Sequence, residues 1–347
     1  MDLPGFSIRT ANHIGHIGRT SHTAHGEQRA QRPQRFGHPP EYGDGTDFGA
    51  DMQRRIILRQ TAARRRHSAF AAGLASLVMA AGLATAPAQA ADKTKYIALG
   101  DSFAAGQGAG PYLDDCYRSL NTYSALADAD KAINLVVNAA CSGATTDGVL
   151  NTQMAELNKS TDLVTITAGG NNIGFGNIIT SCGVALGGAT PGEACDLAIG
   201  SALAQFGPLP GSGPLHEDVL SMIQRVRKAA PNAKIVVTGY PYLLNPVPPG
   251  GTDPASIFID RATQLSDALN ETIAFAAATA NAAASDDPAV QYVDVREIFK
   301  DHGVNSGAPW INLDLTNPAS PDNFHPNAAG YQAYFTELSE AGVYGGN

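Results

Sequence analysis

The sequence predicts one three-layer α/β domain with a parallel β-sheet over residues 91–347. Short apolar runs rich in β-branched residues alternate with longer stretches of helical periodicity. The apolar runs are largely continuous rather than alternating, which is typical of strands buried on both faces. This order of elements implies right-handed crossovers onto a parallel sheet. No segment repeats with a period of roughly 20–50 residues, which excludes solenoids and propellers.

Five strands and several helices follow from this pattern. The strands are expected at residues 96–99, 135–137, 163–167, 235–239 and 290–295. The helical stretches include residues 123–132, 216–230, 255–283 and 328–338. The last apolar run contains Gln291 and Asp294, so we expect it at an edge of the sheet. Three loops rich in Gly and Pro are too long for simple connections and are expected to shape a substrate cleft, at residues 183–192, 206–214 and 240–254.

Residues 52–90 have the pattern of a secretory signal. A basic region is followed by an apolar run over residues 69–84 and by the small-residue sequence Ala88-Gln89-Ala90. The apolar run has 16 residues, fewer than the roughly 20 that span a bilayer. We therefore expect a secreted, extracellular protein that starts at Ala91 and has no stable membrane insertion. A retained anchor is the alternative, and Arg65-Arg66 leaves both the Sec and the twin-arginine route open.

The residues before Met52 have a different character. Residues 1–51 are rich in Gly, His, Arg, Thr and Gln and show no apolar periodicity. We interpret them as a disordered extension or a mis-assigned translation start that carries no function. Their histidines lack the spacing of metal ligands.

The exported part of the chain is strongly acidic. Of the 23 Lys and Arg residues, 11 lie before residue 91, and of the 32 Asp and Glu residues only 6 do. Residues 91–347 therefore hold 12 basic and 26 acidic residues, a net charge of −14. Such a body repels nucleic acids and anionic lipid headgroups, so nucleic-acid partners are not expected.

All four cysteines lie in the exported part, where an even number predicts disulfides. Four cysteines allow three connectivities. Nearest-neighbour pairing, Cys116 with Cys141 and Cys182 with Cys195, closes loops of about 25 and 13 residues, each worth about 3 kcal/mol in the chain-entropy model. The sequence has no C-x-x-C motif, which favours a structural role over redox or zinc chemistry.

Polar segments follow three of the predicted strands, where open parallel sheets bind ligands. They are Gly100-Asp101-Ser102-Phe103, residues 141–145 and Gly169-Gly170-Asn171-Asn172. A fourth segment, residues 322–327, precedes the last predicted helix and contains one of only three histidines after residue 90.

These segments contain the groups of a serine hydrolase. Ser102 at a strand-to-helix turn is the candidate nucleophile, and His325 is the candidate base. The Gly143 backbone and the Asn171 side chain are candidate oxyanion donors. Asp322, three residues before His325, is the candidate that orients the imidazole. Each residue alone has an ordinary interpretation as a turn, glycine loop or cap, and it is their joint order that indicates catalysis.

The chain resembles the GDSL-type SGNH hydrolases, specifically the secreted actinobacterial lipase and esterase branch. The resemblance rests on the Gly100-Asp101-Ser102 strand end, the Cys141–Thr146 block, the Gly-Gly-Asn ending at Asn171, and residues 239–241 and 324–331. It implies a flavodoxin-like α/β/α sandwich with a five-stranded parallel sheet. It also implies Ser102 as nucleophile, His325 as base, and an oxyanion hole made by Ser102, Gly143 and Asn171.

Three positions depart from the family pattern. Phe103 replaces a leucine, and Asn172 replaces the aspartate that usually follows Gly-Gly-Asn. Asn305 stands where a cysteine of a third disulfide is expected, which predicts a looser segment over residues 301–318. Some relatives orient the histidine with a backbone carbonyl, so this alternative to Asp322 stays open.

Other enzyme classes find little support in the sequence. No G-x-S-x-G elbow and no H-E-x-x-H motif is present. The sequence Gly106-Gln107-Gly108-Ala109-Gly110 has its third glycine in the wrong place for a dinucleotide loop. His216 and His302 are expected to be structural or solvated.

We therefore expect a monomeric carboxylic ester hydrolase without metal or cofactor, acting on a small-molecule or lipid ester. A deacetylase on the same site and an inactive exported binding module are the alternatives.

The signal and the cysteines together generate a prediction about the mature protein. Intact mass of secreted material should place its N-terminus near Ala91, and thiol titration should detect no free cysteine. A secreted chain that begins at Met1, or that contains reactive thiols, would contradict the expected export.

Overall fold

The computed structural model describes residues 92–209, 211–283 and 288–345. The predicted extension over 1–51 and the predicted signal over 52–90 lie outside the described residues.

The described chain forms a five-stranded parallel sheet in the order β2-β1-β3-β4-β5. The strands are β1 (Thr94–Gly100), β2 (Ile133–Asn138), β3 (Leu163–Thr167), β4 (Lys234–Thr238) and β5 (Val290–Val293). This confirms the predicted sheet, with its most polar strand at an edge. The chain adds β2 on one side of β1 and β3 on the other, so the switch point where such sheets bind ligands lies between β1 and β3.

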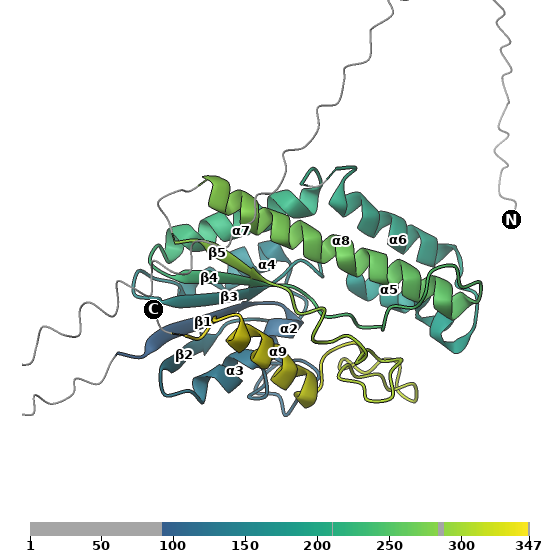
Figure 1. Cartoon of the computed structure of the whole chain (residues 1–347), viewed down its shortest axis with the longest axis horizontal. Coiled ribbons are helices and arrows are strands. Elements are labelled where there is room, and N and C mark those ends of the chain that lie inside the picture. Colours follow the sequence, from purple (N-terminus) through teal and green to yellow (C-terminus); the bar gives the residue numbers. More distant parts are fainter. Residues whose placement is uncertain (1–91, 210, 284–287, 346–347) are drawn as a thin grey trace, which may run out of the picture. The chain divides into compact units, whose positions relative to one another are not determined.

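Helices cover both faces of the sheet (Figure 1). One face is covered by α4 (Thr146–Thr152), α7 (Pro214–Ala229) and α8 (Pro254–Ala283), beside which lie α5 (Phe175–Cys182) and α6 (Glu193–Phe206). The other face packs against α3 (Tyr123–Asp128) and α9 (Ala328–Glu340). The short α2 (Ser102–Ala105) follows β1, and two 3₁₀ turns lie at Met154–Glu156 and Gly183–Gly187. Among the described residues, no helix combines the length and the apolar character that a membrane crossing needs.

The core explains why the central strands are continuously apolar yet contain threonines. Every residue of β3 is buried, because helices pack on both of its faces. On the α3 and α9 side the core is aromatic, and the rings of Tyr123 and Tyr334 stack with centroids 4.8 Å apart. The Tyr123 hydroxyl bonds to Thr167 Oγ1 at 2.9 Å, and the Tyr334 hydroxyl donates to Thr238 Oγ1 at 2.8 Å. The strand threonines thus satisfy buried tyrosines that would otherwise lose hydrogen bonds on burial.

Three helices, α4, α5 and α6, were not predicted from the sequence. Glycines interrupt their periodicity, at Gly148, Gly176 and Gly200. The Gly174 and Gly192 N-caps of α5 and α6 offer no side chain to signal a start. The predicted helix over residues 123–132 ends at residue 128, because the next residues turn directly into β2. Part of the predicted loop over 183–192 is a 3₁₀ turn.

Both disulfides join nearest neighbours in the sequence. Cys116 bonds to Cys141 and Cys182 bonds to Cys195, which confirms that pairing among the three possible ones. The first bridge holds the loop after β2 immediately before Ser142 and Gly143. The second ties the end of α5 to the first turn of α6.

The positions of the two bridges predict different consequences for their removal. The variants Cys116→Ser/Cys141→Ser and Cys182→Ser/Cys195→Ser should each lose about 3 kcal/mol of unfolding free energy in urea titrations. Only the first should also lower the rate of any reaction at Ser102, because its loop contains Gly143. Equal effects of both pairs on that rate would contradict this assignment.

Candidate active site

The ends of β1 and β3 lie against each other and bring two of the predicted polar segments together. Gly100 is the register partner of Thr167, and the Asp101 backbone N–H donates to Thr167 O at 2.9 Å. A Cβ at Gly100 would lie 2.1 Å from Thr167 O, and its φ is +134°. Only glycine fits this approach, which places Ser102 beside the loop that contains Asn171.

The turn that carries Ser102 is held by a buried acid. Asp101 is the N-cap of α2 and accepts the Phe103 N–H at 3.0 Å. Its other oxygen accepts the Tyr240 hydroxyl at 2.5 Å, and Tyr240 accepts the Gly170 N–H at 3.0 Å. Burial raises the pKa of Asp101 to about 7, although these hydrogen bonds oppose the rise. The chain of bonds connects the Ser102 turn to the Asn171 loop.

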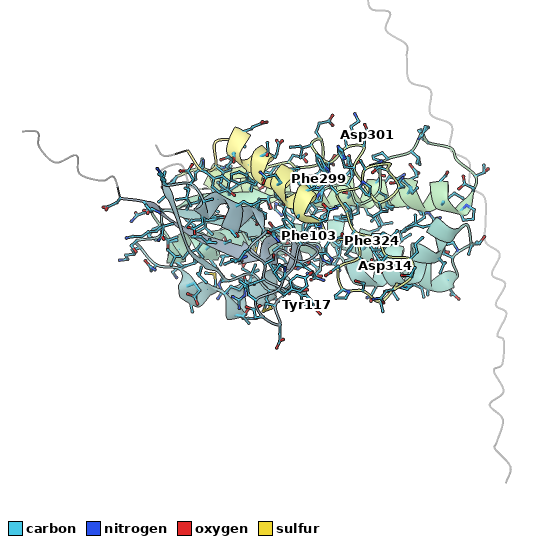
Figure 2. All side chains as sticks on the ribbon, turned by 90° about the horizontal axis from the view of Figure 1, so that it is seen from below. Phe103, Tyr117, Phe299, Asp301, Asp314 and Phe324 are labelled. Carbon is cyan, nitrogen blue, oxygen red and sulfur yellow. A yellow bond between two sulfur atoms is a disulfide. The ribbon has the colours of Figure 1, made fainter. Side chains whose placement is uncertain are left out.

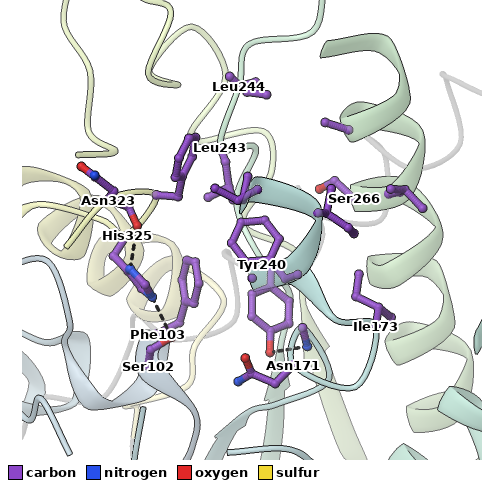
Figure 3. A pocket seen from close by; sticks show the side chains of 18 of the residues that line it. Ser102, Phe103, Asn171, Ile173, Tyr240, Leu243, Leu244, Ser266, Asn323 and His325 are labelled. Atoms are coloured by element: carbon purple, nitrogen blue, oxygen red, sulfur yellow. Dashed lines mark hydrogen bonds between the residues drawn. The ribbon is translucent and has the colours of Figure 1, made fainter. Parts of the chain in front are cut away.

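Ser102 and His325 form a hydrogen-bonded pair. The distance from Ser102 Oγ to His325 Nε2 is 2.8 Å, and His325 Nδ1 lies 3.0 Å from Asn323 O (Figure 3). A carbonyl can only accept, so Nδ1 carries the proton and Nε2 offers its lone pair to the serine hydroxyl. Burial lowers the pKa of His325 to about 4, against the opposing effects of the Asn323 carbonyl, the Asp322 charge and the Pro321 carbonyl. The imidazole is therefore neutral at pH 7 and able to take a proton.

The prediction that Asp322 holds the imidazole is wrong. Its carboxylate accepts the Tyr112 hydroxyl instead. The chain turns tightly here: the His325 N–H donates to Asp322 O at 3.1 Å, and Phe324 has a left-handed backbone with φ +61°. Figure 2 labels Phe324 among the side chains of the fold. This turn presents a backbone carbonyl to Nδ1 and directs the Asp322 side chain elsewhere. The Asp322 side chain acts on the imidazole through its charge, which raises the pKa of His325.

Three N–H donors line the same cavity as Ser102. The backbone N–H groups of Ser102 and Gly143 donate to no group in the part of the chain that the structure describes. Gly143 has a φ of +80°, with open space where a Cβ would stand. Asn171 Nδ2 donates to Ala144 O at 2.9 Å, which orients the amide and leaves its second N–H for a ligand. Together they can stabilise a negative oxygen.

The departures from the family pattern have structural explanations. Asn172 bonds to both the N–H and the hydroxyl of Thr146 and donates to Asp218 at 3.3 Å. An aspartate there would face the Asp218 carboxylate, so the amide suits this neighbour. The Phe103 ring lies 5.3 Å from the His325 ring and 5.1 Å from the Tyr240 ring, between centroids.

Asn305, at the position where the resemblance leads us to expect a cysteine, forms hydrogen bonds to the loop that follows β4. Its amide oxygen accepts the Asn245 N–H at 2.7 Å, and its nitrogen donates to Asn245 O at 3.3 Å. The Val304 N–H adds a bond to Leu243 O at 2.9 Å. The segment expected to be loose is thus joined to the loop that follows β4.

An apolar cavity of about 420 Å³ opens beside Ser102. Of the three loops predicted to shape a cleft, only the one over 240–254 contributes described residues to the lining. The remaining apolar lining comes mainly from α5 and α8, and includes Ile178, Ile179, Phe258, Leu265 and Leu269. Sequence reasoning missed these residues, although the isoleucines that follow Gly-Gly-Asn-Asn were a usable signal.

The two other histidines lie in structural contacts. His216 Nε2 is 3.3 Å from Thr279 Oγ1 between α7 and α8, and His302 stacks on Trp310 with ring centroids 3.6 Å apart. Within the described part of the chain, no three His, Cys, Asp or Glu side chains gather as a metal-binding group.

Comparisons with known proteins show that the chain is similar to lipases. Residues 98–333 match the GDSL-like Lipase/Acylhydrolase family. The chain is 36% identical over 270 residues to Lipase 1 of Streptomyces coelicolor, covering 74% of this chain and 92% of that protein. It is 30% identical to the crystal structure of the extracellular lipase from Streptomyces rimosus, with a TM-score of 0.61 and coverage of 72% and 99%. Phospholipase A1 from Streptomyces albidoflavus is 33% identical, with a TM-score of 0.58 and the same coverage.

The buried imidazole generates a titration prediction. His325 should titrate near pH 4 in NMR spectra of the folded protein, and Asp322→Asn should move its pKa lower, because the substitution keeps an acceptor for Tyr112 but removes the negative charge. The depressed pKa also means that the contribution of His325 to stability is present above the ordinary imidazole value of about 6.5 and is lost as pH falls toward 4. Titration near pH 6.5, or a pKa that Asp322→Asn leaves unmoved, would contradict the assignment.

Proposed function

The chain belongs to the GDSL-like lipase/acylhydrolase family, and we propose that it is a secreted serine esterase that hydrolyses carboxylic acyl esters through an acyl-enzyme on Ser102. The observation that carries the proposal is the 2.8 Å bond between Ser102 Oγ and a neutral, buried His325, in the lining of an apolar cavity. An inactive binding module would have no need of this pair together with free N–H donors.

The first half of the reaction forms the acyl-enzyme. Ser102 Oγ attacks the ester carbonyl carbon while its proton passes to His325 Nε2. The Asn323 carbonyl accepts from Nδ1 and supports the imidazolium that forms. As the tetrahedral species collapses, the bond to the alkoxy oxygen breaks and that oxygen takes the proton from Nε2.

The second half releases the acid. A water attacks the acyl carbonyl and gives its proton to His325, which then returns it to Ser102 Oγ as the acyl bond breaks. In both halves the carbonyl oxygen becomes negative and is stabilised by the N–H groups of Ser102, Gly143 and Asn171. Loss of one such donor typically lowers kcat by about 10²–10³.

The cavity favours an ester with an apolar acyl chain over an acetyl group. Leu269 lies close to the loop after β3. Gly169 in that loop has no Cβ, but a Cβ added there would lie 3.5 Å from Leu269 Cδ1. Phe258 lines the same cavity eleven residues earlier on α8, a distance of about 16 Å at the helical rise. An acetyl group would leave most of this length empty, whereas each methylene buried contributes about 0.8 kcal/mol. This favours esterase or lipase activity over a deacetylase.

Export supports the same assignment. The sequence over residues 52–90 has the features of a signal, and the two disulfides suit an oxidising compartment. The Streptomyces rimosus relative is described as extracellular. We place the enzyme outside the cell, acting on lipid or small-molecule esters.

A series of p-nitrophenyl esters tests the proposal. kcat/KM should rise from acetate toward octanoate, by at most about fourfold per methylene. Ala262→Phe, on the α8 side of the cavity between Leu269 and Phe258, should reduce octanoate turnover and leave acetate turnover unchanged. A serine-directed phosphonate should label Ser102 stoichiometrically and abolish hydrolysis, whereas Ser102→Ala and His325→Ala should each lose several orders of magnitude in kcat. Hydrolysis that persists after complete labelling would contradict the proposal.

A further inference from the structure

The glycine-rich segment over residues 106–110 lies directly against His325. The spacing of its glycines does not match that of a dinucleotide-binding loop. Gly106 caps α2 with a left-handed backbone. Gly108 has φ +95°, and a Cβ there would lie 2.4 Å from Pro326 O and 2.9 Å from His325 Cβ. The glycines therefore allow this segment to lie between the Ser102 turn and the loop that carries the imidazole. Gln107 lies between Gly106 and Gly108 in this segment.

The side chain of Gln107 joins two segments that are distant in the sequence. It is 4% exposed. Its amide oxygen accepts the Ser142 hydroxyl at 2.5 Å, and its amide nitrogen donates to Pro321 O. Its backbone N–H donates to Ser102 O at 3.1 Å. Its carbonyl accepts the Tyr331 hydroxyl of α9 at 2.9 Å.

We propose that Gln107 is a positioning residue that holds the base loop and the oxyanion loop in register with the nucleophile turn. Its two side-chain bonds reach the residue immediately before Gly143 and a carbonyl four residues before His325. One planar amide, itself attached to the Ser102 turn through its backbone, thereby sets the separation of base and oxyanion donor. This inference rests on the proposed roles of Ser102, Gly143 and His325.

The electrostatics of the imidazole support this role. The Pro321 carbonyl is one of the groups that raise the pKa of His325. Gln107 donates to that same carbonyl and so restrains its position near the imidazole. If the amide were lost, both the carbonyl and Ser142 would be free to shift. Misplacement of a catalytic group by about 1 Å can slow a reaction about 10²-fold.

A second buried glutamine shows what a merely structural amide does. Gln153 also uses both ends of its amide, but both bond to the backbone of Gly100, at 2.8 Å each. It stabilises one strand end. Gln107 instead joins two different segments, because its amide bonds to Ser142 at one end and to Pro321 at the other. Two further links restrain the same loops: the hydrogen bond from Tyr112 to Asp322 and the Cys116–Cys141 bridge. Removal of the Gln107 amide should therefore impair the site without unfolding these loops.

Gln107→Met tests the proposal because it keeps the length of the side chain and removes its hydrogen bonds. We expect kcat for p-nitrophenyl octanoate to fall about 10–100-fold, up to the loss that follows a misplacement of about 1 Å. KM should change less than about threefold, because the cavity is untouched. The matched control is Asn281→Ala, which removes an amide bonded twice to Val290 at the opposite end of the sheet. It should lower Tm and leave kcat unchanged.

Ser142→Ala supplies an independent arm that leaves Gln107 in place. It should lower kcat less than Gln107→Met does. The double variant should lose little more than Gln107→Met alone, because both changes remove the same hydrogen bond. Additive losses, or a loss under threefold for both single variants, would overturn the proposal. If Asn281→Ala lowers Tm and kcat as much as Gln107→Met does, loss of stability explains the lower kcat and the proposal is overturned.

Phosphonate labelling distinguishes a failure of the proposed role of Gln107 from a failure of the proposed esterase function. If the wild-type protein is not labelled at Ser102, the proposed function fails. If the wild-type protein is labelled and Gln107→Met is labelled at the same rate, only the role of Gln107 fails. We expect labelling of Gln107→Met to slow by the same factor as kcat.

Discussion

The hydrogen bond between Ser102 and His325 joins residues 223 positions apart, and much of the surrounding structure serves to hold them at 2.8 Å. Ser102 is placed by the end of β1, where Gly100 allows contact with β3. His325 is placed by the tight turn before α9, against which Gly108 packs. Side chains then connect these backbones: Asp101 and Tyr240 on one side, Gln107 and Tyr112 on the other. Although His325 lies in a loop, these contacts hold its imidazole in a fixed position, as a helix or strand would.

Burial has opposite effects on the two titratable groups that flank the nucleophile. It lowers the pKa of His325 to about 4 and raises that of Asp101 to about 7, since both changes favour the neutral form. A carboxylate bonded to the imidazole would raise the His325 pKa further. Here the Asp322 carboxylate is bonded to Tyr112, and a neutral carbonyl holds Nδ1. The base therefore stays unprotonated well into the acid range.

The apolar cavity and the polar site are built by different parts of the chain. The proposed catalytic groups come from loops at the carboxyl ends of the strands, whereas the apolar lining comes mainly from α5 and α8. The bridge from Cys182 to Cys195 attaches α5 to α6. The apolar side chains of α5 and α8 that line the cavity take no part in the hydrogen bonds that hold Ser102 and His325, whereas Asn270 of α8 bonds to the backbone of Tyr240.

The amino-acid sequence by itself determined the strands, their parallel connection, the four polar segments and the presence of disulfides, whereas the structure selected one of the three possible cysteine pairings. These features depend on local apolarity, short loops and residue type, which a single sequence displays. Tertiary structure alone decided that a carbonyl rather than Asp322 orients His325, that α5 and α8 line the cavity, and that Gln107 joins two loops. Each of these depends on contacts between distant segments or on the direction of one side chain in a tight turn. Local sequence does not encode that direction, because it is set by the packing of the whole fold.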